Sequence, residues 1–148
     1  MCYTRQFSGA KDKPLYHMST LNELITLCRA KKKDAKALLK CKRYDGAVYT
    51  CGYIVELALK IKICKTLKWT DYPPPSDCFK SFKTHNLAFL LACTGIEGRI
   101  KKNYLALWSF FTNWSPEMRY EVKKQYSMQE ATDMVNAAVT LQSKICKI

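Results

Sequence analysis

Three polar side chains that could do acid–base or binding chemistry recur within one apolar stretch of the chain: Tyr53, Glu56 and Lys60. Steps of three and four residues place them on one stripe of a helix. A buried carboxylate is costly unless it is paired and hydrogen-bonded, and Lys60, one turn C-terminal to Glu56, is its nearest candidate partner. The spacing therefore indicates either an internal ion pair that fixes the packing or an acid and a base beside a cleft.

A second group of candidates lies at two turns further along the chain. His85 stands at the expected start of a helix, where the helix dipole disfavours a charged imidazole. It could act as a base, contact a nucleotide, or hydrogen-bond the helix end. Arg119 and Tyr120 follow Trp114 closely, which groups a guanidinium with aromatic rings. Such a group can form a pocket for an anion or a stacked base, or a packed corner held by an Arg–Glu pair.

Established catalytic and metal-binding motifs are missing from the sequence. It contains no GxGxxG, Walker-type, GxSxG or HExxH motif. The eight cysteines are widely spaced without a CxxC, and neither His17 nor His85 has a neighbour at metal-ligand spacing. We therefore expect no metal site, no cofactor and no disulfide, and we expect reduced, mostly buried thiols.

The N-terminus lacks the apolar run of a signal peptide, and no apolar run approaches the length that spans a bilayer. These features favour a cytoplasmic protein without a membrane partner. The charge balance favours a polyanionic partner, since 25 Lys+Arg against 12 Asp+Glu give +13 at pH 7. One basic surface recurs at steps of three and four and could follow phosphates or be a solvated face: Arg29, Lys33, Lys36, Lys40 and Arg43.

The elements that must position these residues all have helical periodicity. The apolar stretch 41–68 predicts a central buried helix that starts near Asp45, with Asp45 as its N-cap. Gly52 inside this helix costs about 1 kcal/mol relative to alanine and indicates a close helix approach. Flanking helices are marked by capping boxes at Thr20–Glu23, with an end near residue 41, and at Ser127–Glu130.

Shorter segments connect these helices. The proline-rich stretch 72–77 predicts a loop of about a dozen residues. Further helices are expected over 84–95 and 101–112, and Ser115-Pro116 opens a short one. No strand alternation is visible. The sequence therefore predicts an all-α fold, an up-and-down bundle of four to five helices over residues 19–148, after a flexible N-terminal arm over residues 1–18.

Three segments resemble HEPN domain proteins. RYDGAVY at 43–49 followed by GYIVELALK at 52–60 resembles their second helix. FKTHNL at 82–87 resembles the K-x-H-D-L start of the next helix in one branch of the family. WSPEMRY at 114–120 resembles that branch's W-S-P-E-L-R-Y. Together with the order of the helices, the resemblance covers about residues 20–145.

This resemblance implies a helical bundle, usually a homodimer with a cleft near the dimer seam, that binds RNA or nucleotides. Relatives are often encoded beside a small nucleotidyltransferase in prokaryotic toxin–antitoxin or defence systems. Active members are metal-independent ribonucleases that use an arginine, four to six residues, then a histidine. Counting back from His85, those positions hold Lys80, Phe79 and Cys78. Lysine lacks the guanidinium fork that holds a phosphate through two parallel bonds.

Another departure concerns adenylylation. Some relatives carry an acceptor tyrosine two residues after the histidine, where this chain has Leu87. The leading interpretation is a non-catalytic HEPN-like protein that binds RNA or a nucleotide. Its expected cleft residues are Tyr53, Glu56, Lys60, His85, Trp114, Arg119 and Tyr120.

Two alternatives remain open from the sequence. One is a HEPN ribonuclease that uses His85 with Lys80. The other is a helical protein–protein interaction module, an antitoxin-like partner whose dimer face matters more than its charge.

Overall fold

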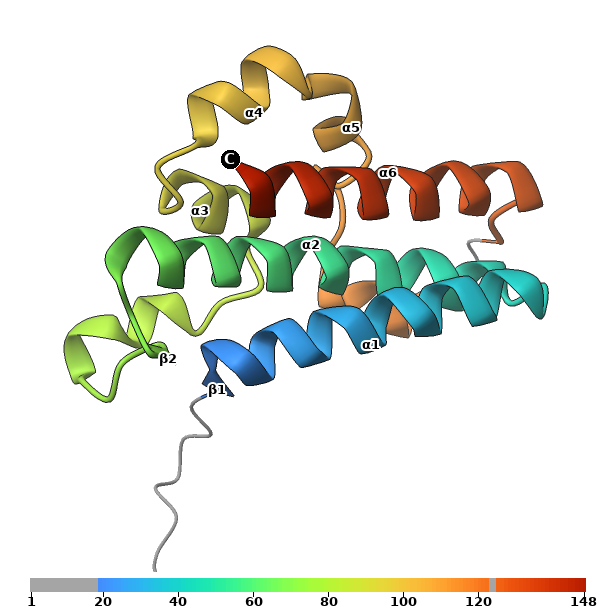
Figure 1. Cartoon of the computed structure of the whole chain (residues 1–148). Coiled ribbons are helices and arrows are strands. Elements are labelled where there is room, and N and C mark those ends of the chain that lie inside the picture. Colours follow the sequence, from blue (N-terminus) through green and yellow to red (C-terminus); the bar gives the residue numbers. More distant parts are fainter. Residues whose placement is uncertain (1–18, 123–124) are drawn as a thin grey trace, which may run out of the picture.

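Three long helices form the centre of the molecule. The computed structural model describes residues 19–122 and 125–148, so the expected N-terminal arm lies outside the described residues. The long helices are α1 (Leu21–Lys40), α2 (Tyr44–Leu67) and α6 (Met128–Lys147). Helix α2 packs against both of the others and is the central element (Figure 1). The all-α fold class predicted from the sequence is confirmed.

The long helices do not simply alternate in direction. Helix α1 runs antiparallel to α2, whereas α6 runs parallel to α2 (Figure 1). The backbone N–H of Tyr126 donates to Asp45 Oδ1 at 2.7 Å, so α2 and α6 begin side by side. The chain between the end of α2 and the start of α6 is built from short pieces. The predicted bundle therefore has three long helices and one segmented side.

Short helical elements make up this segmented side. They are η1 (Asp77–Phe82) and η2 (Pro116–Tyr120), both 3-10 helices, and α3 (Leu87–Ala92), α4 (Glu97–Asn103) and α5 (Leu105–Ser109). The prediction of one continuous helix over 101–112 is wrong. Tyr104, with φ −135° and ψ 26°, leaves helical backbone geometry, so α4 ends there and α5 begins.

A two-stranded ribbon was not predicted. Strand β1 (Ser19–Thr20) pairs antiparallel with β2 (Asp71–Tyr72), with Ser19 opposite Tyr72. Strands of two residues are too short to show alternation, which explains why no strand is visible in the sequence pattern. The predicted proline-rich loop therefore contains β2 and leads into η1.

The ends of α1 and α6 follow their sequence signals. Thr20 Oγ1 accepts from the Glu23 N–H at 3.2 Å, and the Thr20 N–H donates to the Glu23 carboxylate at 2.7 Å. Ser127 and Glu130 form the same reciprocal box at the start of α6. Both predicted capping boxes are confirmed.

Asp45 does not cap α2, and that prediction is wrong. Helix α2 already begins at Tyr44, with Arg43 as an N-cap that makes no side-chain bond. The Asp45 carboxylate instead accepts from the Tyr126 N–H. A tertiary hydrogen bond has taken the place of the local one.

The core surrounds α2, which buries apolar residues on nearly all sides, as its pattern predicts. Helix α6 also buries an apolar face in this core: Ala131, Met134, Val135, Ala138, Leu141 and Ile145. Among the described residues the cysteines are free thiols. Cys28, Cys51 and Cys64 are buried, whereas Cys41 and Cys78 are exposed. No helix in the described ranges is both long and apolar enough to cross a membrane.

Candidate functional site

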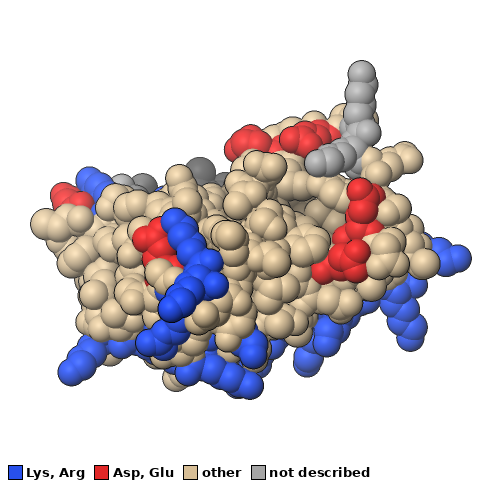
Figure 2. Space-filling view, turned by 90° about the horizontal axis from the view of Figure 1, so that it is seen from above, with Lys and Arg blue, Asp and Glu red and all other residues tan. Residues whose placement is uncertain are grey.

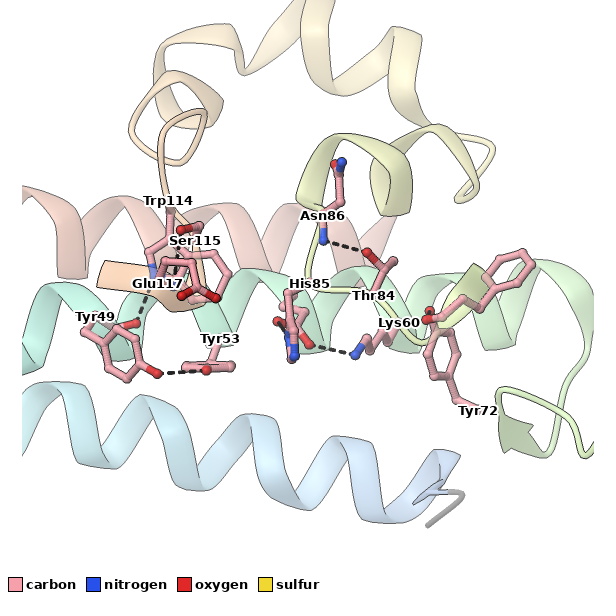
Figure 3. A network of polar contacts seen from close by, with 12 residues as sticks. Tyr49, Tyr53, Lys60, Tyr72, Thr84, His85, Asn86, Trp114, Ser115 and Glu117 are labelled. Atoms are coloured by element: carbon pink, nitrogen blue, oxygen red, sulfur yellow. Dashed lines mark hydrogen bonds and ion pairs between the residues drawn. The ribbon is translucent and has the colours of Figure 1, made fainter. Parts of the chain in front are cut away.

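Glu56 is the most buried charged side chain of the site, with 3% of its surface exposed. Its Oε1 accepts from Lys60 Nζ at 2.6 Å, which confirms the pairing predicted from the spacing. Its Oε2 lies 2.8 Å from His85 Nδ1 (Figure 3). One buried carboxylate therefore fixes two cationic or proton-bearing groups that come from different segments of the chain.

His85 is positioned by the turn that precedes α3. Asn86, not His85, caps this helix, since the Asn86 side chain accepts from the Phe89 N–H at 3.0 Å. The Asn86 N–H donates to Thr84 Oγ1 at 3.1 Å, which closes the turn around His85. The imidazole therefore has no helix-end role and points to Glu56, and 55% of its side chain is exposed.

Trp114 brings the third segment against α2. Its indole Nε1–H donates to the Tyr49 carbonyl at 3.0 Å. The indole covers Gly52, where an added Cβ would overlap the ring atoms. The close approach predicted at Gly52 is therefore real, but an aromatic ring makes it and not a helix. Ser115 then caps η2 and Pro116 takes its first position, as predicted.

A chain of phenols connects α2 to η2. The hydroxyls of Tyr49 and Tyr53 lie 2.9 Å apart, and the Tyr53 ring meets the Trp114 ring edge-on at 5.0 Å. Burial, followed by the hydrogen bond with Tyr49, raises the pKa of Tyr53 to about 12, so its phenol stays protonated at neutral pH. The Arg119 guanidinium lies 4.9 Å over the Tyr120 ring. Interactions with the Tyr120 hydroxyl and then with Tyr49 raise the pKa of Arg119.

The turn before α3 and the segment from Trp114 to Arg119, together with α5, enclose the larger of two neighbouring hollows. It has a volume of about 660 Å³. His85 and Arg119 contribute the positive or proton-bearing groups, and Trp108, Phe111 and Trp114 contribute aromatic surface. Further polar groups come from Thr84, Asn86, Thr112, Ser115 and Glu117.

A smaller hollow of about 290 Å³ lies on the other side of His85. Lys60 and Lys83 supply its charges, and Tyr72 supplies an aromatic ring. Lys60 Nζ lies 5.3 Å over that ring. The apolar part of the wall comes from Leu24, Leu27, Leu57 and Pro73.

The seven expected cleft residues meet in one region but do not all face a hollow. His85, Trp114 and Arg119 line the larger hollow, while His85 and Lys60 line the smaller one. Glu56 and Tyr53 lie behind this surface and contact His85. Tyr120 is exposed and reaches the site through Arg119.

Other sequence candidates lie elsewhere. Lys80 pairs with Asp77 at 3.0 Å, and it lines neither hollow that His85 faces. The basic surface is exposed at Arg29, Lys33, Lys36, Lys40 and Arg43, and none of these five lines either hollow. Arg43 lines a separate, shallow hollow, which Asp45 also lines.

Several lining residues were missed by sequence reasoning. Ser115 and Glu117 stand inside the W-S-P-E segment, and Thr84 and Asn86 flank His85, so their motifs could have indicated them. Trp108 carries no such signal, because its apolar type predicts only a core position. Comparisons with protein families, with curated proteins and with solved structures find no match for this chain.

Proposed function

We propose that this chain is a non-catalytic, HEPN-like protein that binds RNA or a nucleotide in the larger hollow. The observation that carries the proposal is that His85, fixed by Glu56, and Arg119 face one hollow of about 660 Å³ that is lined by aromatic rings. The Arg119 guanidinium can form charge-assisted hydrogen bonds to phosphate, and the imidazole can donate a further hydrogen bond. The largely buried rings of Trp108, Phe111 and Trp114 give the hollow an apolar wall against which a base can pack. Ligand sites have volumes of about 300–1,000 Å³, and this hollow falls inside that range.

The sequence resemblance supports the same proposal. The segments that resemble HEPN proteins, at 52–60, 82–87 and 114–120, supply the Glu56–Lys60 pair, His85 and Arg119. These residues come together in the fold around the two hollows. The three segments that carry the motifs are far apart in the sequence but meet at one surface. This favours a common binding site over three unrelated packing contacts.

The ribonuclease alternative has less support. It assigns the cation of the site to Lys80, and Lys80 is 60% exposed, paired with Asp77 and outside both hollows. Binding without cleavage is therefore the function that the geometry supports best. RNA incubated with the wild type and with His85→Ala should remain equally intact in both samples.

The binding test compares two variants with a matched control. His85→Ala and Arg119→Ala should each lower the affinity for a labelled nucleotide or short RNA about tenfold, since a hydrogen bond to a charged group contributes about 1.5–3 kcal/mol. Arg99→Ala removes the same charge from an exposed position on α4 and should leave the affinity unchanged. Fluorescence anisotropy at low and moderate salt measures these affinities. Absence of binding at both salt concentrations would refute the proposal.

We also propose that the protein is a cytoplasmic homodimer with a small nucleotidyltransferase as its partner. Leu105, the first residue of α5, and Phe110, which follows its last, expose 58% and 44% of their surfaces, and the same α5 segment contributes Trp108 and Phe111 to the larger hollow, which supports a seam near the cleft. Light scattering should then give twice 17.1 kDa. Leu105→Asp should lower that mass to one chain. A wild type that is monomeric at high concentration contradicts the dimer, and a preparation from its native cells in which no nucleotidyltransferase co-purifies contradicts the partner.

A further inference from the structure

We propose that Cys28 and Cys146 form a redox-active pair, in which a peroxide oxidises Cys146 and Cys28 then closes a disulfide that ties α1 to α6. This inference goes beyond the proposed binding function and does not depend on it. It follows from the register of α1 against α6, from the groups around the two sulfur atoms, and from the unequal exposure of the two thiols.

The register of the helices places the two cysteines opposite each other. Helix α1 runs antiparallel to α2 and α6 runs parallel to it, so α1 and α6 are antiparallel to each other (Figure 1). Lys32 Nζ donates to Gln142 Oε1 at 2.9 Å, which fixes one contact between the two helices. In an antiparallel pair, one turn back on the first helix faces one turn forward on the second. Cys28 lies four residues before Lys32, and Cys146 lies four residues after Gln142.

The electrostatics of Cys28 agree with this register. Burial first, and then the neighbouring Cys146, raises the pKa of Cys28 to about 11, whereas Lys32 acts in the opposite direction. Both thiols are free in this structure. A disulfide needs Cβ atoms that face each other and Cα atoms within about 7 Å. The register makes the two side chains face each other, and the last turn of α6, which holds Cys146, can adjust because helix ends fray.

Cys146 is the thiol that an oxidant can reach. It is partly exposed, whereas Cys28 is 2% exposed and its Sγ lies 3.7 Å from the Ile54 carbonyl oxygen. Gln142 Nε2 donates to Cys146 Sγ at 3.3 Å. The ammonium of Lys32 has only donors, so the Gln142 oxygen must face it and the amide NH₂ is directed to the sulfur. A lysine beside a partly exposed thiol is typical of the surroundings of reactive cysteines.

The reaction consumes one peroxide and both thiols. The Cys146 thiolate attacks a peroxide oxygen and the O–O bond breaks, which leaves a sulfenic acid and a hydroxide that takes up the Cys146 proton. The Cys28 sulfur then attacks the sulfenic sulfur. The S–S bond forms, the S–O bond breaks, and the hydroxide leaves with the Cys28 proton as water. Each sulfur loses one electron and the peroxide gains two, and a thiol reductant reverses the bond by exchange.

The first test treats the reduced full chain with hydrogen peroxide, blocks the remaining thiols with N-ethylmaleimide in urea, and maps tryptic peptides without reduction. The peptides that hold Cys28 and Cys146 should appear linked, about 2 Da lighter than their sum, because two hydrogen atoms leave. Dithiothreitol should separate them. Cys78, an exposed thiol, reports the general reaction with peroxide. Oxidation of Cys78 without the linked peptides, or a sulfinic acid at Cys146 beside an unmodified Cys28, would overturn the inference.

The second test checks the order of the two steps. In Cys28→Ala the sulfenic acid at Cys146 has no thiol to resolve it, so dimedone should label Cys146 after peroxide treatment. In Cys146→Ser the buried Cys28 should stay unmodified. Cys93→Ser, which changes another partly exposed cysteine, is the control and should form the cross-link as the wild type does. The inference fails if Cys28→Ala carries no label at Cys146, or if Cys28 forms a disulfide with another cysteine in Cys146→Ser.

Discussion

At the scale of single residues, Gly52 determines where the Trp114 ring can lie, because glycine has no side chain. Gly52 costs α2 helical stability, because glycine is about 1 kcal/mol less favourable than alanine inside a helix. In return the Trp114 indole lies directly on the helix backbone and donates to the Tyr49 carbonyl. Trp114 also lines the larger hollow, so this contact connects helix packing to the shape of the candidate site.

Gly52→Ala should therefore destabilise the protein in spite of the better helix propensity of alanine. The added methyl group overlaps the indole of a buried tryptophan, and overpacking of this kind costs about 1–3 kcal/mol. Gly98→Ala in α4 is the matched control, since a Cβ there meets nothing within 4 Å. That variant should be stabilised by about 0.4–1 kcal/mol. Urea unfolding measures both changes, and the same sign for the two variants would contradict the prediction.

Cys51 should make stability fall at alkaline pH. Burial raises the pKa of its thiol to about 12, against about 8.5 for a free thiol. The folded state therefore holds this proton more tightly than the unfolded state does. The resulting stabilisation is complete below about pH 8.5 and is lost as the pH rises toward 12, at up to about 1.4 kcal/mol per pH unit.

Denaturant titrations between about pH 7 and pH 10.5, on either side of the ordinary thiol pKa, check this expectation. Cys51→Ala should lower stability at neutral pH and show a shallower decline with pH than the wild type. Cys78→Ala, which changes an exposed thiol, should keep the wild-type slope. Identical slopes in all three proteins would mean that Cys51 does not titrate on unfolding.

Among the secondary-structure elements, the first turns of α1 and α6 are specified locally, whereas the break between α4 and α5 is not. Thr20 and Ser127 each satisfy backbone donors of their own helix through a box of four residues. No proline or glycine lies at the break between α4 and α5 at Tyr104, so local helix propensity does not predict this break.

Removing either cap should weaken the fold by a similar amount. Thr20→Ala and Ser127→Ala should each cost about 1 kcal/mol, because each removes the side-chain oxygen that accepts from a backbone N–H in the first turn of its helix. The two effects should add in the double variant, since independent sites that share no partners are additive. Thr26→Ala, an exposed threonine inside α1, is the control and should stay within about 0.5 kcal/mol of the wild type. Urea midpoints give the values, and a double variant no weaker than the singles would argue against independent caps.

Over the molecule as a whole, the exposed lysines of α1 and the candidate site occupy different surfaces. Figure 2 shows lysine and arginine side chains crowded along one long edge of the face that it presents, with acidic groups away from that edge. The exposed lysines of α1 line neither hollow beside His85. A long RNA could contact both surfaces, whereas a mononucleotide could contact only one.

The triple variant Lys33→Gln, Lys36→Gln, Lys40→Gln should separate the two surfaces. It should weaken binding of an RNA of about 20 nucleotides and lower its salt slope by up to about 2, since each phosphate that a lysine no longer neutralises accounts for about 0.7. Mononucleotide affinity should stay as in the wild type. Anisotropy titrations over a range of salt concentrations measure both. A parallel weakening of mononucleotide binding would place the lysines at the same site as His85.

Features that depend on near neighbours in the chain could be predicted without the folded structure. Helical periodicity identified α2 and its burial, the capping boxes marked two helix starts, and the Glu56–Lys60 pair followed from a spacing of four. The physical reason is that helix geometry determines which residues within one or two turns can meet. The same local logic explains why Trp114-Ser115-Pro116 opens a short helix as expected.

Contacts between residues that are far apart in the sequence are visible only in the folded structure. There Glu56 has a second partner 29 positions away in His85, and Asp45 accepts from Tyr126 and does not act as a cap. The basic surface and the hollows are also separate there. These outcomes depend on the path that the short elements between α2 and α6 take across the molecule. That path is set by packing against α2, at Gly52 and Trp114 above all, and no periodicity within a single segment encodes it.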